Sequence, residues 1–201
     1  MENINQPNKK IMFWLLVIIN LIMSISDLVI TFIGSPDLSS EANPLIYTFS
    51  LSWKSLIICS SIFLIIIVML LYYAFFRFRR SVIQCDGFRQ YISILFFNRP
   101  DKFIWALYKF PKNKIGLSYL GVSLGYVLAI VIPIMKLVAV FLWVEVINNY
   151  SIVNFYHSNF NIKMTPLGRT DTLIVGIILA LLIWYYWFNK EYKINKKALE
   201  K

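Results

Sequence analysis

The sequence predicts an all-α, polytopic integral membrane protein, a four-helix bundle with a cytoplasmic amphipathic insertion. Of its 201 residues, 59% are hydrophobic and 15% are charged, and the mean hydropathy is +0.66. A soluble domain of this length could not solvate so much apolar surface. Four stretches are apolar enough to cross roughly 30 Å of hydrocarbon, which takes about 20 helical residues. The basic residues gather in segments that would share one side of such a bundle.

The four spans are expected at about 11–34, 56–76, 118–147 and 171–189. The second span has an earlier alternative start at Pro44, because Asn43 is a favourable helix N-cap and proline suits the first helical position. A cleaved signal peptide is the rival interpretation of the first span, but no small-x-small cleavage site follows it and the apolar run is too long. We expect a single membrane domain over 1–201.

The distribution of charge predicts the topology. Of the twenty lysines and arginines, two precede the first span, nine lie from Arg77 to Lys114, and five follow Phe188. By the positive-inside rule, both termini are expected in the cytoplasm of a prokaryotic cell, with outer loops at 35–52 and 148–170. The cations would then contact anionic lipid headgroups in the plasma membrane, at roughly 1 kcal/mol each. We expect no nucleic-acid partner, since the basic excess is explained by topology.

The insertion, at about 77–115, mixes arginines with aromatic residues in segments too short to span a membrane. It could lie along the inner leaflet as one or two amphipathic helices broken near Pro100, with the aromatics toward the acyl chains. It could equally pack under the bundle. The tail after 189 is expected to be a solvated basic helix or a frayed end whose lysines anchor the last span.

A polar stripe runs along the first predicted helix. Asn20, Ser24, Asp27 and Thr31 are spaced four, three and four residues apart, so their side chains fall on one face. An aspartate facing lipid would cost about 2.5 to 3.5 kcal/mol on insertion scales, so this face should point into the bundle. Helix packing explains the two hydroxyl residues. It does not explain a charge, because packing needs none.

Two lysines are expected at about the depth of Asp27. Lys54 lies about ten residues inside a helix that starts at 44, and Lys136 about eleven residues before the predicted end of the third span, each roughly 15 Å deep at 1.5 Å per residue. A charge at that depth persists when it is paired, so we expect Asp27 to pair with Lys54, Lys136 or both. Glu41 and Glu145 would lie above them. The candidate cluster comprises Asn20, Ser24, Asp27, Thr31, Glu41, Asn43, Lys54, Lys136 and Glu145.

Two interpretations of this cluster remain open. A neutralising ion pair could serve only to fix the register of the helices. Alternatively, the cluster could line an outward-open polar cavity that binds a small ligand, carries an ion or holds reacting groups. Pro133, near Lys136, would kink the third span and free backbone carbonyls beside the charge.

Motifs for soluble chemistry are missing from the sequence, which has no CxxC, HExxH, GxGxxG or P-loop pattern. His157 is the single histidine, and its spacing from Glu41, Glu145 and Asp171 shows no ligand periodicity, so no metal and no cofactor are expected. Cys59 and Cys85 are too far apart in the topology for a disulfide. Catalytic residues cannot be assigned, although Ser24 or Thr31 beside Asp27 is one nucleophile arrangement.

The favoured function is therefore a non-catalytic membrane component or a subunit that binds a ligand or partner protein, with homo-oligomer formation as one way of assembling. Transport of a small solute or ion is the alternative, and an intramembrane enzyme ranks third. Carriers more often show inverted repeats or discontinuous helices, and four spans are few for a monomeric carrier.

The pattern Asn20…Asp27…Thr31, followed by Glu41-x-Asn43-Pro44 and a lysine in the next helix, resembles a family of small prokaryotic integral membrane proteins known as a domain of unknown function (5658-type). The resemblance covers roughly the first third to half of the chain. It implies a membrane protein without an assigned chemistry. The basic insertion and the final span depart from the family pattern, so the resemblance implies nothing about them.

Overall fold

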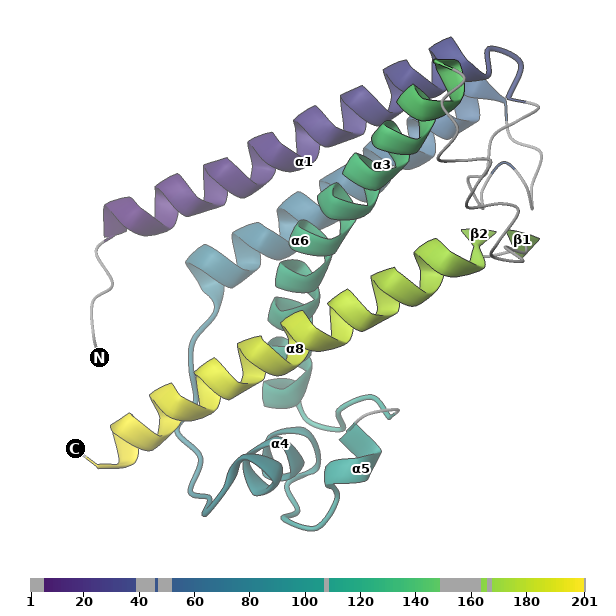
Figure 1. The fold of residues 1–201 in the computed structure, drawn as a ribbon. Coiled ribbons are helices and arrows are strands. Elements are labelled where there is room, and N and C mark those ends of the chain that lie inside the picture. The colour runs from purple at the N-terminus through teal and green to yellow at the C-terminus, as the bar shows by residue number, and fades with distance from the viewer. Residues whose placement is uncertain are drawn as a thin grey trace. The chain divides into compact units, whose positions relative to one another are not determined.

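The computed structural model describes residues 6–38, 46, 52–106, 109–148, 164–165 and 168–200. Its long helices are α1 (Gln6–Gly34), α3 (Trp53–Tyr72), α6 (Lys114–Ile147) and α8 (Thr170–Leu199), as Figure 1 shows. A π-helical turn, η1 (Tyr73–Arg77), follows α3, and the short helices α4 (Phe88–Phe97) and α5 (Phe103–Ala106) lie between η1 and α6. The two-residue strands β1 (Met164–Thr165) and β2 (Gly168–Arg169) pair antiparallel before α8.

In the described part of the chain, four helices are long and apolar enough to cross a membrane, which confirms the predicted all-α, four-span fold. The candidate spans are Asn8–Gly34, Trp53–Arg77, Lys114–Ile147 and Leu173–Leu199. The first and third end where the sequence predicts. For the second, the start at Pro44 lies outside the described residues, and α3 begins at Trp53. The last span was predicted to end near 189, with the tail as a basic helix or a frayed end, and α8 continues as a helix to Leu199.

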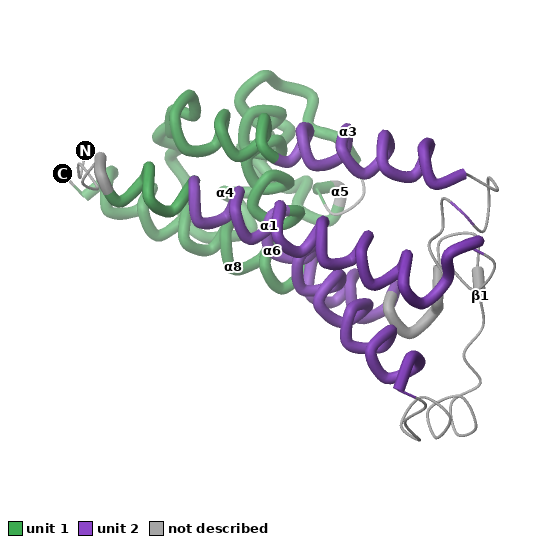
Figure 2. The backbone as a smooth tube through the Cα atoms, turned by 90° about the horizontal axis from the view of Figure 1, so that it is seen from above, with its two compact units in different colours: residues 1–13, 68–128, 181–201 green, residues 14–67, 129–180 purple. Residues whose placement is uncertain are grey.

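The chain forms two compact units, coloured separately in Figure 2. Unit 1 comprises 1–13, 68–128 and 181–201, and unit 2 comprises 14–67 and 129–180. All four long helices contribute residues to both units, so the units are not consecutive domains along the chain. Unit 1 contains sixteen of the twenty basic residues, namely the three groups that the sequence places on one side.

The core of unit 1 is aromatic and includes the predicted insertion. On α4, the residues Tyr91, Ile92, Leu95 and Phe96 are fully buried. The Phe96 ring packs edge-on against Phe188 of α8, with ring centroids 5.6 Å apart. Burial of one such side chain contributes about 1.5 to 3 kcal/mol. Of the two arrangements expected for the insertion, the structure has α4 packed against the helices, with its apolar face inward.

Close packing of α1 on α6 organises unit 2. A Cβ atom added at Gly34 would lie 2.3 Å from the Trp143 ring, so only glycine permits this approach. The chain then turns at Leu38, which adopts a left-handed conformation with φ 62°. The Trp53 indole N–H donates to the Pro36 carbonyl at 2.6 Å and joins the start of α3 to this turn. These contacts position the three helices that carry the candidate site.

Candidate functional site

The polar stripe on α1 faces the protein, as its spacing predicts. Asn20 and Thr31 are buried, with exposed fractions of 2% and 5%, and Ser24 and Asp27 are partly buried. The opposite face carries exposed Ile22, Ile25 and Val29. An apolar outer face with a polar inner stripe is the arrangement expected of a spanning helix that presents its polar groups to other helices.

Asn20 compensates for the proline in α6. Pro133 has no backbone N–H, so the carbonyl of Ala129, four residues earlier, loses its helical donor. The Asn20 amide Nδ2 donates to that carbonyl at 2.9 Å, and also to the Leu16 carbonyl of its own helix at 2.9 Å. A neighbouring side chain thus satisfies the backbone group that the proline frees, as hydrocarbon surroundings require. The freed carbonyl lies about two helical turns before Lys136 along α6 and is bonded to Asn20.

Asp27 and Lys136 face each other between α1 and α6. The Lys136 ammonium Nζ lies 3.5 Å from the Asp27 carboxylate Oδ2, and it donates a hydrogen bond of 3.1 Å to the Ser24 hydroxyl. The exposed side-chain fractions are 23% for Asp27 and 19% for Lys136. The pairing expected between Asp27 and Lys136 is therefore present. A charge-assisted hydrogen bond is usually about 2.7 to 2.9 Å long, so this pair is loose.

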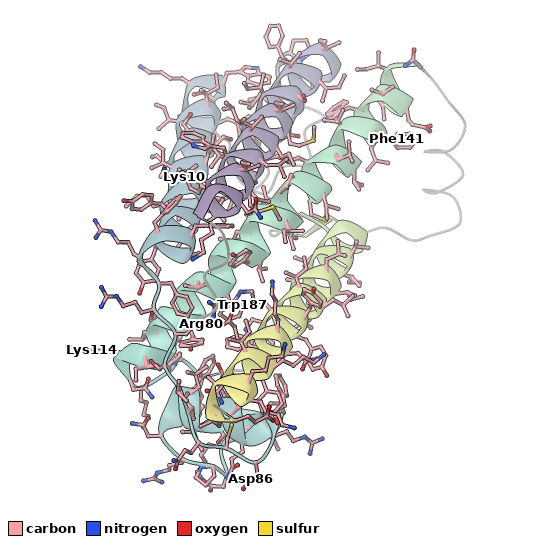
Figure 3. All side chains as sticks on the ribbon, turned by 90° about the vertical axis from the view of Figure 1, so that its left-hand side faces the viewer. Lys10, Arg80, Asp86, Lys114, Phe141 and Trp187 are labelled. Carbon is pink, nitrogen blue, oxygen red and sulfur yellow. The ribbon has the colours of Figure 1, made fainter. Side chains whose placement is uncertain are left out.

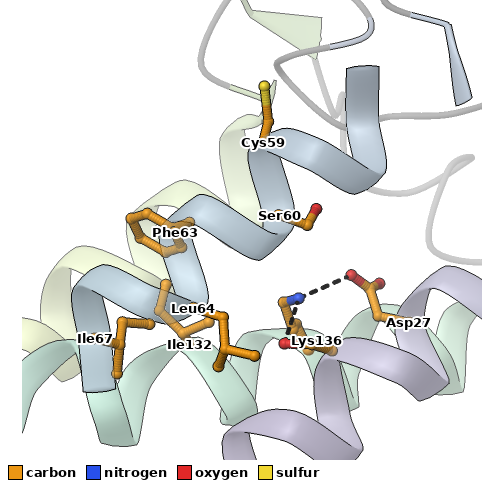
Figure 4. Close-up of a pocket in the computed structure, with 9 residues that line it drawn as sticks. Asp27, Cys59, Ser60, Phe63, Leu64, Ile67, Ile132 and Lys136 are labelled. Atoms are coloured by element: carbon orange, nitrogen blue, oxygen red, sulfur yellow. Dashed lines mark hydrogen bonds and ion pairs between the residues drawn. The ribbon is translucent and has the colours of Figure 1, made fainter. Parts of the chain in front are cut away.

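A cavity of about 140 Å³ opens beside the ion pair, between α1, α3 and α6 (Figure 4). Its polar wall consists of Ser24, Asp27, Lys136 and Ser60. The remaining wall is formed by Cys59, Phe63, Leu64, Ile67 and Ile132. A buried apolar cavity of about 150 Å³ holds a benzene molecule, so this space suits one small molecule or several waters.

The other predicted cluster residues that the structure describes do not line this cavity. Lys54 is exposed on α3, and no described carboxylate lies within ion-pair distance of it, so the alternative pairing of Asp27 with Lys54 does not occur there. Thr31 is buried one turn beyond Asp27. Glu145 is buried near the end of α6, and its Oε2 has no hydrogen-bond partner among the described residues. Glu41 and Asn43 lie outside the described residues.

No group of three or more histidine, cysteine or acidic side chains that could hold a metal occurs in the described part of the chain. His157 lies outside that part, so the sequence expectation about a metal stays a prediction. Both described cysteines are free. Desolvation raises the pKa of the Cys85 thiol above its usual value, which lowers its nucleophilicity at neutral pH. The polar groups of the cavity wall are thus one carboxylate, one ammonium group, two hydroxyls and the Cys59 thiol.

The α3 side of the cavity was not predicted from the sequence. Cys59, Ser60 and Ser61 form a run of small polar residues within the apolar α3. Small residues allow close approach of helices in membranes, so this run was an available signal for a buried or cavity-lining position. The residues around this run in α3 are strongly apolar, so the run was not recognised as a cavity-lining position.

A second polar network, in unit 1, was also missed. The carboxylate of Glu191, 3% exposed, accepts two hydrogen bonds from Arg80, at 2.7 Å from Nε and 2.9 Å from Nη2. This interaction raises the pKa of the Arg80 guanidinium. Asn195, one turn further along α8, accepts from the Ile83 N–H and donates to the Ile83 carbonyl, each at 2.8 Å. The labelled Arg80 and Trp187 in Figure 3 mark this part of unit 1.

This network corrects the expectation for the tail. Trp187, Glu191 and Asn195 recur every four residues, and all three are buried. The segment after 189 is therefore neither frayed nor uniformly solvated, because one of its faces holds the extended chain that leaves η1. The lysines of this segment, Lys190, Lys193, Lys196 and Lys197, are exposed, as expected of snorkelling residues.

No family model, curated protein or solved structure matches this chain. The resemblance to the 5658-type family of unknown function stays a prediction.

Proposed function

We propose that this chain is a non-catalytic, multi-pass membrane protein that binds one small polar molecule at Asp27 and Lys136. The observation that carries the proposal is the cavity beside the ion pair: both charged groups form part of its wall and keep a partly exposed surface. A pair that served only to fix helix register would be best stabilised by full closure, with every polar atom satisfied. Among the described contacts, both groups keep acceptor or donor capacity that no protein group uses.

The chemistry of the wall disfavours catalysis. Asp27 has Lys136 as its neighbour, the Ser24 hydroxyl accepts a hydrogen bond from the Lys136 ammonium, and no hydrogen bond joins Ser24 to the Asp27 carboxylate among the described contacts. A serine nucleophile needs a base that takes its own proton. A binding role needs only the complementary charges and hydroxyls that are present.

Native mass spectrometry of the protein extracted with its membrane lipids tests the binding proposal. The wild type is expected to retain a small molecule that the double variant Asp27→Asn, Lys136→Gln lacks. The double variant removes both charges together, so neither partner is left as an unpaired ion. Identical spectra of wild type and variant, both without a bound small molecule, would contradict the proposal.

Transport of a small solute or ion is the second candidate, favoured by one observation. The polar stripe of α1 runs from Thr31 to Asn20, and buried Leu16 and Phe13 continue the same face as an apolar end. Such a stripe would give a path from one end of the helix to the middle of the span. Uptake of the retained molecule into proteoliposomes would favour transport, and binding without uptake would favour the non-catalytic subunit.

We further propose that the basic groups of unit 1 face the cytoplasm and contact anionic lipids. The exposed cations of its insertion, including Arg79, Arg89, Lys109 and Lys112, support this orientation. Single cysteines at Phe110, which is 79% exposed, and at Asn148, after α6, should label from opposite sides of the membrane when Cys59 and Cys85 are replaced by alanine. Labelling of both from the same side would contradict the orientation.

A further inference from the structure

We infer that the ligand of this cavity is a small zwitterion, with one ammonium group and one carboxylate on a short apolar body. A small aliphatic amino acid has this chemistry. The inference rests on the proposed binding function and specifies its ligand. It is drawn from the charges, the hydrogen bonds and the size of the cavity wall.

The two charges of the wall are opposite and loosely paired. The Lys136 ammonium is 3.5 Å from the Asp27 carboxylate, and both groups line the cavity. A ligand with a single charge would engage one of them and leave the other without a partner in a membrane, which is unfavourable. A zwitterion that enters between them replaces one internal pair with two pairs to the ligand. Charge is then balanced both before and after binding.

The hydrogen-bonding groups are also complementary to a zwitterion. A carboxylate offers about four acceptor positions, and Lys136 is the one described group in contact with that of Asp27. Capacity for a ligand ammonium therefore remains. The Lys136 ammonium has three N–H donors: one donates to Ser24 and one faces Asp27, so a third is available to a ligand carboxylate. The Ser60 hydroxyl, on the α3 side of the wall, can donate or accept.

The size and the apolar wall limit the body of the ligand. A cavity of about 140 Å³ matches a molecule of about six heavy atoms, the size of benzene. Phe63, Leu64, Ile67 and Ile132 would surround a short alkyl group. L-Alanine has six heavy atoms and all three features, so it is the appropriate probe.

Calorimetric titration of the protein in phosphatidylglycerol nanodiscs tests the inference with three probes. L-Alanine is compared with ethylamine, which lacks the carboxylate, and with propionate, which lacks the ammonium group. We expect L-alanine to bind at least tenfold more tightly than either single-charge analogue. Equal or tighter binding of ethylamine or propionate would overturn the inference.

Variants and a second lipid separate the remaining outcomes. The double variant Asp27→Asn, Lys136→Gln should lose alanine binding, whereas Lys54→Gln, at the exposed lysine of α3, should retain it. Phosphatidylethanolamine carries an ammonium group and a phosphate in place of the carboxylate, so alanine binding that this lipid competes away would overturn the small amino acid and identify a lipid headgroup as the ligand. If no probe binds while mass spectrometry detects a retained molecule without both charges, the inference fails and the binding function stands. If no probe binds and mass spectrometry detects no retained molecule, the inference and the proposed binding function both fail.

Discussion

Replacement of Asp27 by leucine, with Lys136 retained, should destabilise the protein by about 3 kcal/mol. The substitution leaves the Lys136 ammonium facing α1 with the Ser24 hydroxyl as its remaining described partner. Lys136 lies about eleven residues from the end of α6, roughly 16 Å along the axis, so its side chain cannot reach the interface by snorkelling.

The magnitude follows from the geometry of the pair. Two unit charges 3.5 Å apart attract by about 5 kcal/mol at an effective dielectric constant of 20. Loss of one partner of a buried pair costs about 3 to 5 kcal/mol. The partial exposure of both side chains and the hydrogen bond to Ser24, worth about 1 kcal/mol, place the expected loss at the lower end of that range.

A double-mutant cycle of Asp27→Leu and Lys136→Met measures this loss. The free energy of unfolding of each variant is determined in mixed micelles of fixed composition. Each single variant should lose about 3 kcal/mol of unfolding free energy, and the double variant should recover most of it, because no unpaired charge remains. Lys54→Met is the matched control at an exposed lysine and should change stability by less than about 0.5 kcal/mol. Additive losses in the double variant, or unchanged single variants, would refute the pairing.

Three further predictions concern other contacts. Asn20→Leu should lower the free energy of unfolding by about 0.6 to 1.7 kcal/mol in the same assay. Adding Pro133→Ala should restore part of this stability, because the alanine N–H then bonds the Ala129 carbonyl. A further loss of stability in the double variant would contradict this role of Asn20. Arg80→Met should accelerate hydrogen exchange in 78–86, since the guanidinium holds this segment on α8, and unchanged exchange would argue against that contact. Burial raises the pKa of the Tyr91 phenol, so the unfolded chain ionises first: stability should be unaffected below about pH 10 and fall above it. Tyr91→Phe should flatten this alkaline loss, and an unchanged pH profile would exclude Tyr91 as its source.

The fold was predictable because hydrocarbon imposes strong constraints on sequence. Helix ends at Gly34 and Ile147 coincide with the loss of apolar residues, which hydropathy detects directly. The buried face of α8 beyond 189 was not predicted, because lysines follow Trp187 and mask a buried stripe that continues to Asn195. The packing of α4 depends on aromatic contacts with a helix about ninety residues away in sequence, such as Phe96 with Phe188. A local pattern cannot distinguish that partner from lipid.

The candidate site was predictable on α1 and only partly elsewhere. Spacing places Asn20, Ser24 and Asp27 on one face without reference to other helices. Counting residues along each helix places Lys54 and Lys136 at the same depth in the membrane. The count does not tell which way either side chain points around the helix axis. In the structure, rotation exposes Lys54 and turns Lys136 toward α1. The cavity itself depends on three helices at once, which no single pattern reports.

An experimental density map of the protein extracted with native lipids tests the central claim most directly. The Asp27 carboxylate and the Lys136 ammonium are expected to face one cavity between α1, α3 and α6, with density for a small molecule bridging them or beside them. Density that places the carboxylate against acyl chains, with no amine or hydroxyl near it, would contradict the site and every function proposed for it.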